Sequence, residues 1–285
     1  MEIKKIAVIG AGTMGAGIAQ TAAQAEYDVI LCDVFADQLQ RGLANIRGML
    51  AKGVERGKLT EEERDAALAR LRTTSDVADA ARNADLAIEA IPEQMHRKQE
   101  MFRSLDEACP AHAVLASNTS SLSIDEIAAA TKRPEQVLGM HFFNPVPIMK
   151  LLELVKGEQT SDATLANGRE VAKRMGKTSI TVRNAPGFAT SRLGIVLGME
   201  AIRMVEQGVA SAEDIDTAMT LGYAHPMGPL RLTDLVGLDV RLSIAESLHE
   251  RLGSDAFRPP ELLRRMVAEG KLGKKSGRGF YEWND

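Results

Sequence analysis

The sequence predicts an α/β protein in two parts, a domain built on a mostly parallel β-sheet followed by an all-helical domain. Three observations lead to this prediction. The first 33 residues read as strand, glycine-rich turn, helix and strand. Short apolar runs then alternate with helical segments as far as residue 183, which is typical of a parallel sheet. Beyond residue 189 there are few strand signals, and helical patterns predominate.

Seven short apolar runs have the length and composition of buried strands. Two of them flank the glycine-rich turn, and the other five follow at intervals along the chain. They are residues 3–9, 27–33, 86–91, 113–117, 137–142, 150–155 and 178–183. Because parallel strands need long crossover connections, the segments between these runs are expected to be mostly helical.

Two amphipathic helices are expected over residues 37–57 and 60–71. The second begins with "TEEE", in which Thr60 and Glu63 have the spacing of a capping box. This helical pair also carries three cations close together, Lys52, Arg56 and Lys58. Such a run is usually a solvated helix face, and contact with a phosphorylated ligand is the alternative.

The alternation of strand and helix signals ends at "NAPGF", residues 184–188, and helical patterns follow. We therefore predict a first domain over residues 1–184 and a helical domain over residues 185–285. The segment 191–208 is apolar on more than one face, so something must bury it. A second copy of the chain is a natural partner for a domain of this size, which predicts a homodimer through the C-terminal helices.

Composition narrows the class of protein. Of the 285 residues, 45% are hydrophobic and 26% are charged, as in an ordinary soluble globular protein, and the net charge is −4. This balance argues against nucleic acid or an anionic membrane as partner. The two cysteines, Cys32 and Cys109, have no metal-ligand spacing, and no metal site is expected. Without a secretory signal or a long apolar run, a cytoplasmic protein is expected.

The glycine-rich turn has the spacing G-x-G-x-x-G, with Gly10, Gly12 and Gly15 enclosing Thr13 and Met14. The motif follows a predicted strand and opens a predicted helix, which is the context that a dinucleotide-binding, Rossmann-like unit requires. The free N–H groups at the start of that helix would face the cofactor phosphates. The alternative is a glycine turn in a nucleotide-free α/β protein.

Asp33 stands at the end of the second strand, 18 residues after Gly15. A carboxylate at this position can accept hydrogen bonds from the ribose hydroxyls of the adenosine and would repel a 2′-phosphate, so NAD is favoured over NADP. In the nucleotide-free alternative, Asp33 would only cap a helix.

Polar clusters follow three of the predicted strands. They are "AIPEQ", "SNTSS" and "HFFNP", and in an open α/β sheet such positions border the binding crevice. His141 begins the third cluster at a strand end, which favours a functional histidine over one satisfied in the core. Just after the second cluster, Ser123 and Glu126 resemble a capping box, which leaves Ser117, Asn118 and Ser120 for ligand contact.

Glu153 interrupts the apolar run "KLLELV". A buried carboxylate needs a partner, because an unpaired buried charge is very costly. The imidazole of His141 is one candidate, and the carboxylate would then hold one tautomer and favour its protonated form. The alternative is a surface pair with Lys150 or Lys156. The basic, glycine-rich segment "GKKSGRGFYEW", residues 273–283, is either a flexible tail or a lysine donor to a ligand phosphate.

The sequence as a whole resembles the short-chain L-3-hydroxyacyl-CoA dehydrogenases, with the bacterial 3-hydroxybutyryl-CoA dehydrogenases as the nearest group. The resemblance covers nearly the whole chain, and "HFFNPV" with "SNTSS" is far more specific than the glycine motif. The segments that carry it are "GAGTMGAGIAQ", "ASNTSSLSI", "GMHFFNPVPIMKLLELV", "PGF", "EDIDTAM", "HPMGPL", "DLVGLD" and "GKKSGRGFY".

This resemblance implies oxidation of the 3-hydroxyl of an acyl-CoA by NAD, with a Rossmann-like domain and a dimer-forming helical domain. By matching motif, His141 is the general base, Glu153 orients it, and Ser120 binds the reacting oxygen. The resemblance also implies cofactor contacts besides the glycine loop, and it places CoA near Lys52, Arg56 and Lys58. The positions that match cofactor contacts are Asp33, Glu93, Lys98, Asn144 and Lys275, with Asn118 and Ser120 in the polar loop beside them.

One position departs from the family pattern. Where the family has an asparagine that helps to position the substrate, "PGFATSR" has Ser191, which is shorter and lacks the amide. Two other functions therefore stay open. One is an NAD-dependent dehydrogenase of a 3-hydroxy acid or sugar acid without CoA, and the other is a non-catalytic NAD-binding protein.

Overall fold

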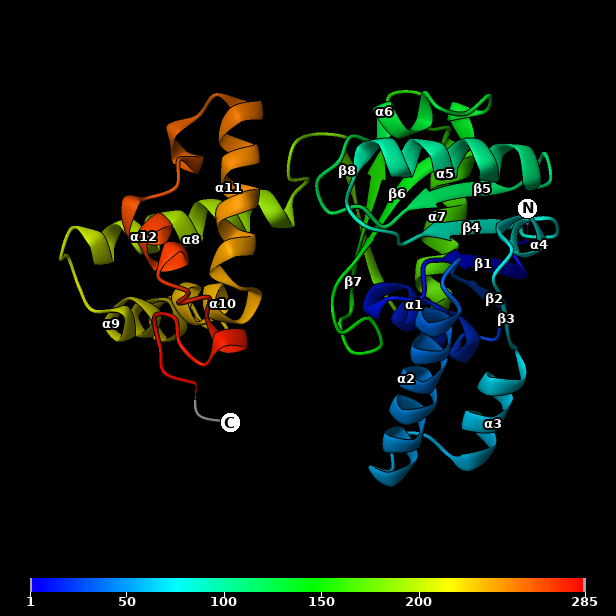
Figure 1. The fold of residues 1–285 in the computed structure, drawn as a ribbon, viewed down its shortest axis with the longest axis horizontal. Helices are drawn as coiled ribbons and strands as arrows, with labels where there is room; N and C mark the ends of the chain where they lie inside the picture. The colour runs from blue at the N-terminus through cyan, green and yellow to red at the C-terminus, as the bar shows by residue number, and fades with distance from the viewer. Residues whose placement is uncertain (1, 284–285) are drawn as a thin grey trace. The chain divides into compact units, whose positions relative to one another are not determined.

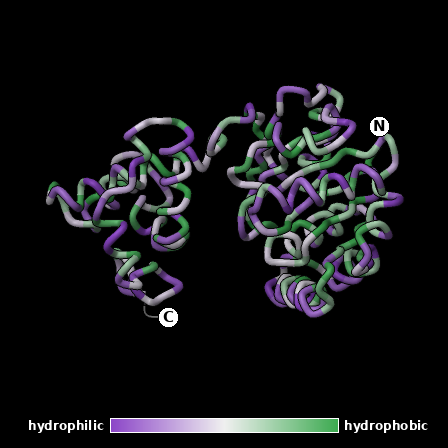
Figure 2. Tube along the Cα trace, turned by 45° about the horizontal axis from the view of Figure 1, so that its top comes forward, coloured by the Kyte–Doolittle hydropathy of each residue, from purple (hydrophilic) through white to green (hydrophobic). Residues whose placement is uncertain are grey.

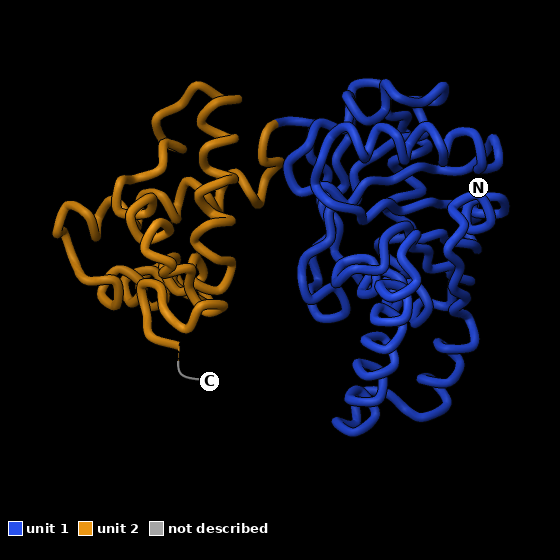
Figure 3. Tube along the Cα trace, in the orientation of Figure 1, with its two compact units in different colours: residues 1–185 blue, residues 186–285 orange. Residues whose placement is uncertain are grey.

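The computed structural model describes residues 2–283 and divides the chain into two compact units, residues 1–185 and 186–285 (Figures 1 and 3). The first unit is an eight-stranded sheet with helices on its faces, and the second is helical, as the sequence predicts. No helix in the described part of the chain has both the length and the apolar character needed to cross a membrane.

The sheet is mostly parallel and has the strand order β3-β2-β1-β4-β5-β6-β7-β8. The strands from β3 to β6 in this order run parallel, β7 is antiparallel to β6, and β8 is parallel to β7. The strands are β1 (Lys5–Ile9), β2 (Asp28–Cys32), β3 (Leu71–Thr74), β4 (Leu86–Glu89), β5 (Val114–Ser117), β6 (Val137–Phe142), β7 (Leu151–Lys156) and β8 (Thr178–Arg183). The order reverses direction between β1 and β4, which is where open α/β sheets bind their ligands.

Helices join the strands of the first unit. They are α1 (Thr13–Gln24), α2 (Ala36–Glu55), α3 (Glu61–Ala69), α4 (Val77–Ala81), α5 (Met95–Ala108), α6 (Ile124–Ala128) and α7 (Asp162–Arg174), with a short 3₁₀ turn, Pro134–Gln136. The capping box at the start of α3 is confirmed, because Thr60 and Glu63 exchange both side chain–backbone hydrogen bonds. In Figure 1, α2 and α3 form a hairpin that extends away from the sheet.

The expected helix over residues 60–71 is wrong at its end. The helix stops at Ala69, and Leu71–Thr74 pairs with β2 as an edge strand. This strand has no fully buried residue and carries Arg72 on an exposed position. Its apolar pattern is therefore too weak to be recognised, since it pairs through backbone groups at the edge of the sheet.

The core of the first unit lies around the central strands (Figure 2). Val8, Leu31 and Ile88, on three neighbouring strands, are all fully buried. Each such side chain contributes roughly 1.5–3 kcal/mol when it is removed from water. This packing fixes the carboxyl ends of β1, β2 and β4, and with them the loops that follow.

The second unit has its own core, formed between helices that include α8, α10, α11 and α12. Its elements are α8 (Thr190–Glu206), α9 (Ala212–Thr217), a π-helical turn η2 (Ala218–Gly222), α10 (Pro229–Val236), α11 (Leu238–Leu252), a 3₁₀ turn η3 (Asp255–Phe257), α12 (Glu261–Ala268) and a 3₁₀ turn η4 (Lys274–Ser276). Ser211 caps α9 by accepting from the Asp214 N–H.

Candidate active site

The glycine loop connects β1 to α1 with little space for side chains. Gly10 has φ +104°, a conformation that favours glycine. A Cβ on Gly15 would lie 1.7 Å from the Gly10 carbonyl oxygen, so only glycine lets the turn and the helix pack this closely. The Cβ position of Gly12 is open, with only the Gln38 amide nitrogen at 3.8 Å. The backbone at Gly12 is therefore accessible to a ligand at the N-terminus of α1.

A pocket of about 1020 Å³ opens in front of this loop, at the carboxyl ends of β1, β2 and β4. Its lining includes Gly10, Gly12, Thr13, Met14 and Asp33 from the predicted cofactor set. The opposite wall comes from the loop after β4 and from α5, with Ala90, Ile91, Pro92, Arg97, Glu100 and Met101. An open backbone at the helix N-terminus beside a large pocket fits a dinucleotide.

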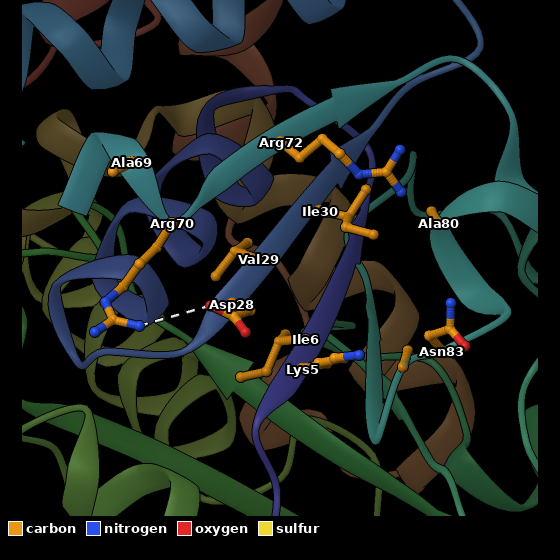
Figure 4. A pocket seen from close by; sticks show the side chains of 11 residues that line it. Lys5, Ile6, Asp28, Val29, Ile30, Ala69, Arg70, Arg72, Ala80 and Asn83 are labelled. Atoms are coloured by element: carbon orange, nitrogen blue, oxygen red, sulfur yellow. Dashed lines mark ion pairs between the residues drawn. The ribbon is translucent and has the colours of Figure 1, made fainter. Parts of the chain in front are cut away.

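A smaller cavity of about 330 Å³ lies near the amino ends of β1 and β2 (Figure 4). Its arginines already have carboxylate partners, because Arg70 lies 3.6 Å from Asp28 and Arg72 lies 2.9 Å from Asp79. None of the predicted site residues lines it. The candidate site is therefore the large pocket at the carboxyl ends of the strands.

The carboxylate of Asp33 is fixed by two backbone amides. Its oxygens accept from the Ala11 N–H at 2.8 Å and from the Phe35 N–H at 3.0 Å. These bonds tie the end of β2 to the glycine loop and hold the carboxylate at the pocket. Each oxygen keeps a lone pair with which it can accept a further hydrogen bond.

Glu93 joins the loop after β4 to the loop after β5. Its Oε1 accepts from Thr119 Oγ1 at 2.6 Å, and from the Ser120 N–H and Oγ at 2.9 and 3.2 Å. The Ser121 N–H and Oγ also donate to it, at 3.1 and 3.3 Å. Burial raises the pKa of Glu93, but Lys98 and these hydrogen bonds outweigh it and the pKa is lowered overall.

Lys98 and Glu89 form a fully buried ion pair beneath these loops. The Lys98 ammonium lies 2.6 Å from Glu89 Oε1 and 3.3 Å from Glu93 Oε2. Sequence reasoning missed Glu89, although a glutamate inside the apolar run "LAIEAI" gives the same signal that drew attention to Glu153. The structure thus brings Glu93, Lys98 and Ser120 together in one network and adds Glu89 to it.

His141 and Glu153 face each other across the antiparallel pair β6–β7. The two residues are in direct register, and His141 Nδ1 lies 2.7 Å from Glu153 Oε2. Both are buried, with 7% and 0% of their surfaces exposed. The alternative of a surface pair is wrong, and Lys156 instead lies 2.6 Å from Asp162. A carboxylate can only accept, so Nδ1 carries the shared proton and Nε2 carries the lone pair of the neutral ring.

Asn118 connects the β5 end to the β6 end, because its Oδ1 accepts from the Phe142 N–H at 2.9 Å. The loops that follow β4, β5 and β6 are therefore joined by side-chain hydrogen bonds. Asn144 is exposed on the loop after β6. Lys52 and Arg56 are exposed on the α2–α3 hairpin, outside both cavities, which gives them no built ligand contact.

Ser191 and Lys275 belong to the second unit. Ser191 is half-buried in the first turn of α8, and Lys275 Nζ lies 2.5 Å from Asp239 Oδ1. The alternative that residues 273–283 form a flexible tail is wrong. The fully buried Asp234 accepts from the Phe280 N–H, the Tyr281 N–H and Trp283 Nε1, all at 2.9 Å, which anchors this segment on α10.

Within residues 2–283, no group of three or more histidine, cysteine, aspartate and glutamate side chains could hold a metal ion. What the structure does present is a dinucleotide-type pocket at the switch point of a Rossmann-like sheet, with a carboxylate-backed histidine in the same unit. Together these features define the class of nicotinamide-dependent dehydrogenases.

Comparison with known proteins identifies the family. Residues 5–185 match the model of the 3-hydroxyacyl-CoA dehydrogenase NAD binding domain, and residues 187–283 match that of its C-terminal domain. The chain belongs to the 3-hydroxyacyl-CoA dehydrogenase family and is an NAD-dependent enzyme of this class. The resemblance that the sequence motifs indicated is therefore confirmed.

Individual relatives agree with this assignment. A probable 3-hydroxybutyryl-CoA dehydrogenase of Bacillus subtilis is 50% identical, over 100% of this chain and 99% of the relative. The human mitochondrial hydroxyacyl-coenzyme A dehydrogenase is 42% identical, over 99% of this chain and 91% of the relative. The crystal structure of (S)-3-hydroxybutyryl-CoA dehydrogenase PaaH1 from Ralstonia eutropha matches with a TM-score of 0.96 and 41% identity, and all of both chains is covered.

Proposed function

We propose that this enzyme oxidises (S)-3-hydroxyacyl-CoA to 3-ketoacyl-CoA, with 3-hydroxybutyryl-CoA as a substrate. Relatives covered over nearly their whole length carry this activity in their names, which supports the substrate class. The observation that carries the mechanism is the 2.7 Å contact between His141 Nδ1 and Glu153 Oε2. It leaves Nε2 with the lone pair that a general base needs.

In this proposal, His141 removes the proton of the 3-hydroxyl as the alkoxide character of that oxygen develops. The imidazolium that forms lies against the Glu153 carboxylate, which stabilises it in a buried environment. The glycine loop and Asp33 would hold NAD, which would supply the acceptor for the hydride from C3. In the reverse direction, the imidazolium returns its proton to the keto oxygen.

Ser120 would donate a hydrogen bond to the reacting oxygen. Its backbone N–H and its hydroxyl both donate to Glu93 Oε1. The hydroxyl has a single hydrogen, which would turn from Glu93 to the reacting oxygen while the backbone N–H keeps the loop in place. The glycine loop, Asp33, Glu93, Asn118, Asn144 and Lys275 would hold the cofactor, and Lys52 and Arg56 would meet CoA. Lys98, which is 1% exposed and lies 3.3 Å from Glu93 Oε2, would act on the cofactor through Glu93. Ser191 would position the substrate with its hydroxyl.

The decisive experiment follows NADH oxidation with acetoacetyl-CoA, longer 3-ketoacyl-CoAs and free acetoacetate. Turnover of the thioesters with little turnover of the free acid is the expected result. Preference for the free acid would favour the dehydrogenase that acts without CoA. Binding of NADH without turnover of any substrate would favour a non-catalytic protein. A parallel series with Ser191→Asn would show whether the serine sets the preference for chain length.

We also propose that the chain has two functional domains: an NAD-binding domain, residues 1–184, and a helical domain for dimerisation and substrate contact, residues 185–285. We further propose that the enzyme is cytoplasmic. β-Oxidation of fatty acids is the pathway class that this chemistry fits. The helical domain supports a homodimer because α10 exposes three apolar side chains at helical spacing, Leu232, Leu235 and Val236.

Leu235→Asp is expected to convert the dimer into a monomer, because a charge placed in an apolar interface loses its hydration without gaining a partner. Analytical ultracentrifugation would measure the change, relative to a chain mass of 30.8 kDa. Ile180→Asp, at another exposed apolar side chain but in the first unit, is the matched control. A Leu235→Asp protein that sediments as wild type would contradict an interface on α10.

A further inference from the structure

Glu89 is a buried charged group in the first unit to which the proposed chemistry assigns no role. It ends β4, and its surface is 0% exposed. Oε1 accepts from Lys98 Nζ at 2.6 Å and from the Ile91 N–H at 2.7 Å, and Oε2 accepts from Ser117 Oγ at 2.7 Å. Each of these donors lies on or next to a loop at the candidate site.

The three donors place Glu89 at the junction of two loops. Ile91 lies in the loop after β4, which lines the large pocket. Ser117 ends β5, and its hydroxyl also accepts from the Thr119 N–H at 3.3 Å. The Glu89 carbonyl accepts in addition from the Asn118 N–H at 2.8 Å. Glu89 therefore anchors both of the loops that meet at the Glu93–Ser120 contact, the loop after β4 and the loop after β5.

Lys98 has an acceptor for each of its three ammonium hydrogens. They are Glu89 Oε1 at 2.6 Å, the Ile91 carbonyl at 3.3 Å and Glu93 Oε2 at 3.3 Å. The cation is 1% exposed, so water does not screen it. The two carboxylates compete for it, and the shorter distance gives Glu89 the larger share.

We infer that Glu89 is a positioning residue for the cofactor site: it holds the Lys98 ammonium back from Glu93, so that Glu93 keeps its bonds to the loop with Thr119 and Ser120. Without the Glu89 charge, Lys98 has one anionic partner left and moves toward Glu93. Glu93 then turns from the serine loop to the ammonium. This inference rests on the proposed cofactor contacts of Glu93 and Ser120.

The first test is the affinity for NADH, measured by fluorescence titration of the intact protein. Glu89→Gln keeps the size and most hydrogen bonds of the side chain but removes its charge, and it is expected to raise the Kd for NADH by about tenfold. Glu89→Asp, which restores the charge, is expected to recover part of the affinity. An unchanged Kd in Glu89→Gln would overturn the inference.

A double-mutant cycle separates positioning from general loss of structure. If Glu89 acts through Lys98, the effect of Glu89→Gln on the Kd largely disappears in the Lys98→Met background, whereas independent effects would multiply and overturn the inference. Lys98→Met leaves Glu89 buried without its cation and can prevent folding. In that case Glu93→Gln replaces it, because the chain of contacts passes through Glu93 as well.

Asp106→Asn is the matched control, because it removes one partner of another ion pair in the same unit, the half-buried Asp106 with Arg133 at 2.6 Å. It is expected to lower the unfolding midpoint without changing the Kd for NADH. The reaction with acetoacetyl-CoA is measured on the same wild-type sample. Wild type that binds NADH without turnover would contradict the proposed function alone, while active wild type with an unaffected Glu89→Gln Kd would contradict the Glu89 inference alone.

Discussion

Replacement of His141 by alanine is expected to lower turnover of 3-hydroxybutyryl-CoA by about 10²–10⁴-fold, the usual contribution of a general base. The affinity for NADH is expected to stay near that of wild type, because no cofactor contact is assigned to this side chain. Steady-state turnover and fluorescence titration measure the two effects separately. A large effect is expected because no other histidine lies in β6 or in the loops after β4 and β5. The histidine that comes next to these loops in sequence is His96, at the start of α5.

The alanine variant also removes the partner of Glu153, which is 0% exposed, and so carries a cost in stability. His141→Gln addresses this cost, since its amide can still donate to the carboxylate, and the same loss of turnover is expected. His112→Ala is the matched control. That histidine is exposed, lies 3.0 Å from Asp85 and has no assigned role. Near-normal turnover in a folded His141→Gln protein would contradict the general-base assignment.

The part of the fold that sequence reasoning predicts well depends on local patterns. The glycine loop, the buried strands and the Thr60 capping box each follow from residues within one short segment. β3 was missed because its pairing with β2 is a long-range backbone interaction and its side chains are half-exposed. A pattern that relies on burial cannot detect a strand that buries little.

The site shows the same division between local and long-range information. Gly10, Gly12 and Asp33 are recognised by their spacing, whereas the pairing of His141 with Glu153 depends on the register of β6 against β7. The sequence left that pairing open against a surface alternative, because a shift of one residue would turn Glu153 to the other face of the sheet. Glu89 was missed because its partners come from three separate segments. Two glutamates, Glu89 and Glu153, interrupt buried strands. Each has a buried partner, which is the ammonium of Lys98 for Glu89 and the imidazole of His141 for Glu153.

Glu153→Gln isolates the electrostatic part of the mechanism. The amide oxygen can still accept from His141 Nδ1, so the orientation of the ring is expected to be kept while the negative charge is lost. The imidazolium formed during oxidation then lacks its buried counter-charge. Turnover is expected to fall by about 10- to 100-fold, the range for loss of a partner that orients a functional histidine.

The pH dependence gives this variant a signature that a loss of structure would not produce. Oxidation needs the neutral imidazole, so its rate falls on the acid side, and the Glu153 charge can act on this acid limb because it lies against the ring. Without the charge, the acid limb is expected to move to lower pH, because the imidazolium loses a stabilising partner. Reduction needs the protonated imidazole, and its basic limb is expected to move in the same direction.

Rates in both directions, measured across pH for wild type and Glu153→Gln, test this pattern. Glu158→Gln is the matched control, because this glutamate is exposed two residues beyond β7 and its loss should move neither limb. If a folded Glu153→Gln enzyme were slower with both limbs unmoved, Glu153 would only orient the ring, and its charge would not act on the proton. If the limbs moved in opposite directions, His141 would not be the group that carries the proton both ways, since one titrating imidazole must move both limbs together.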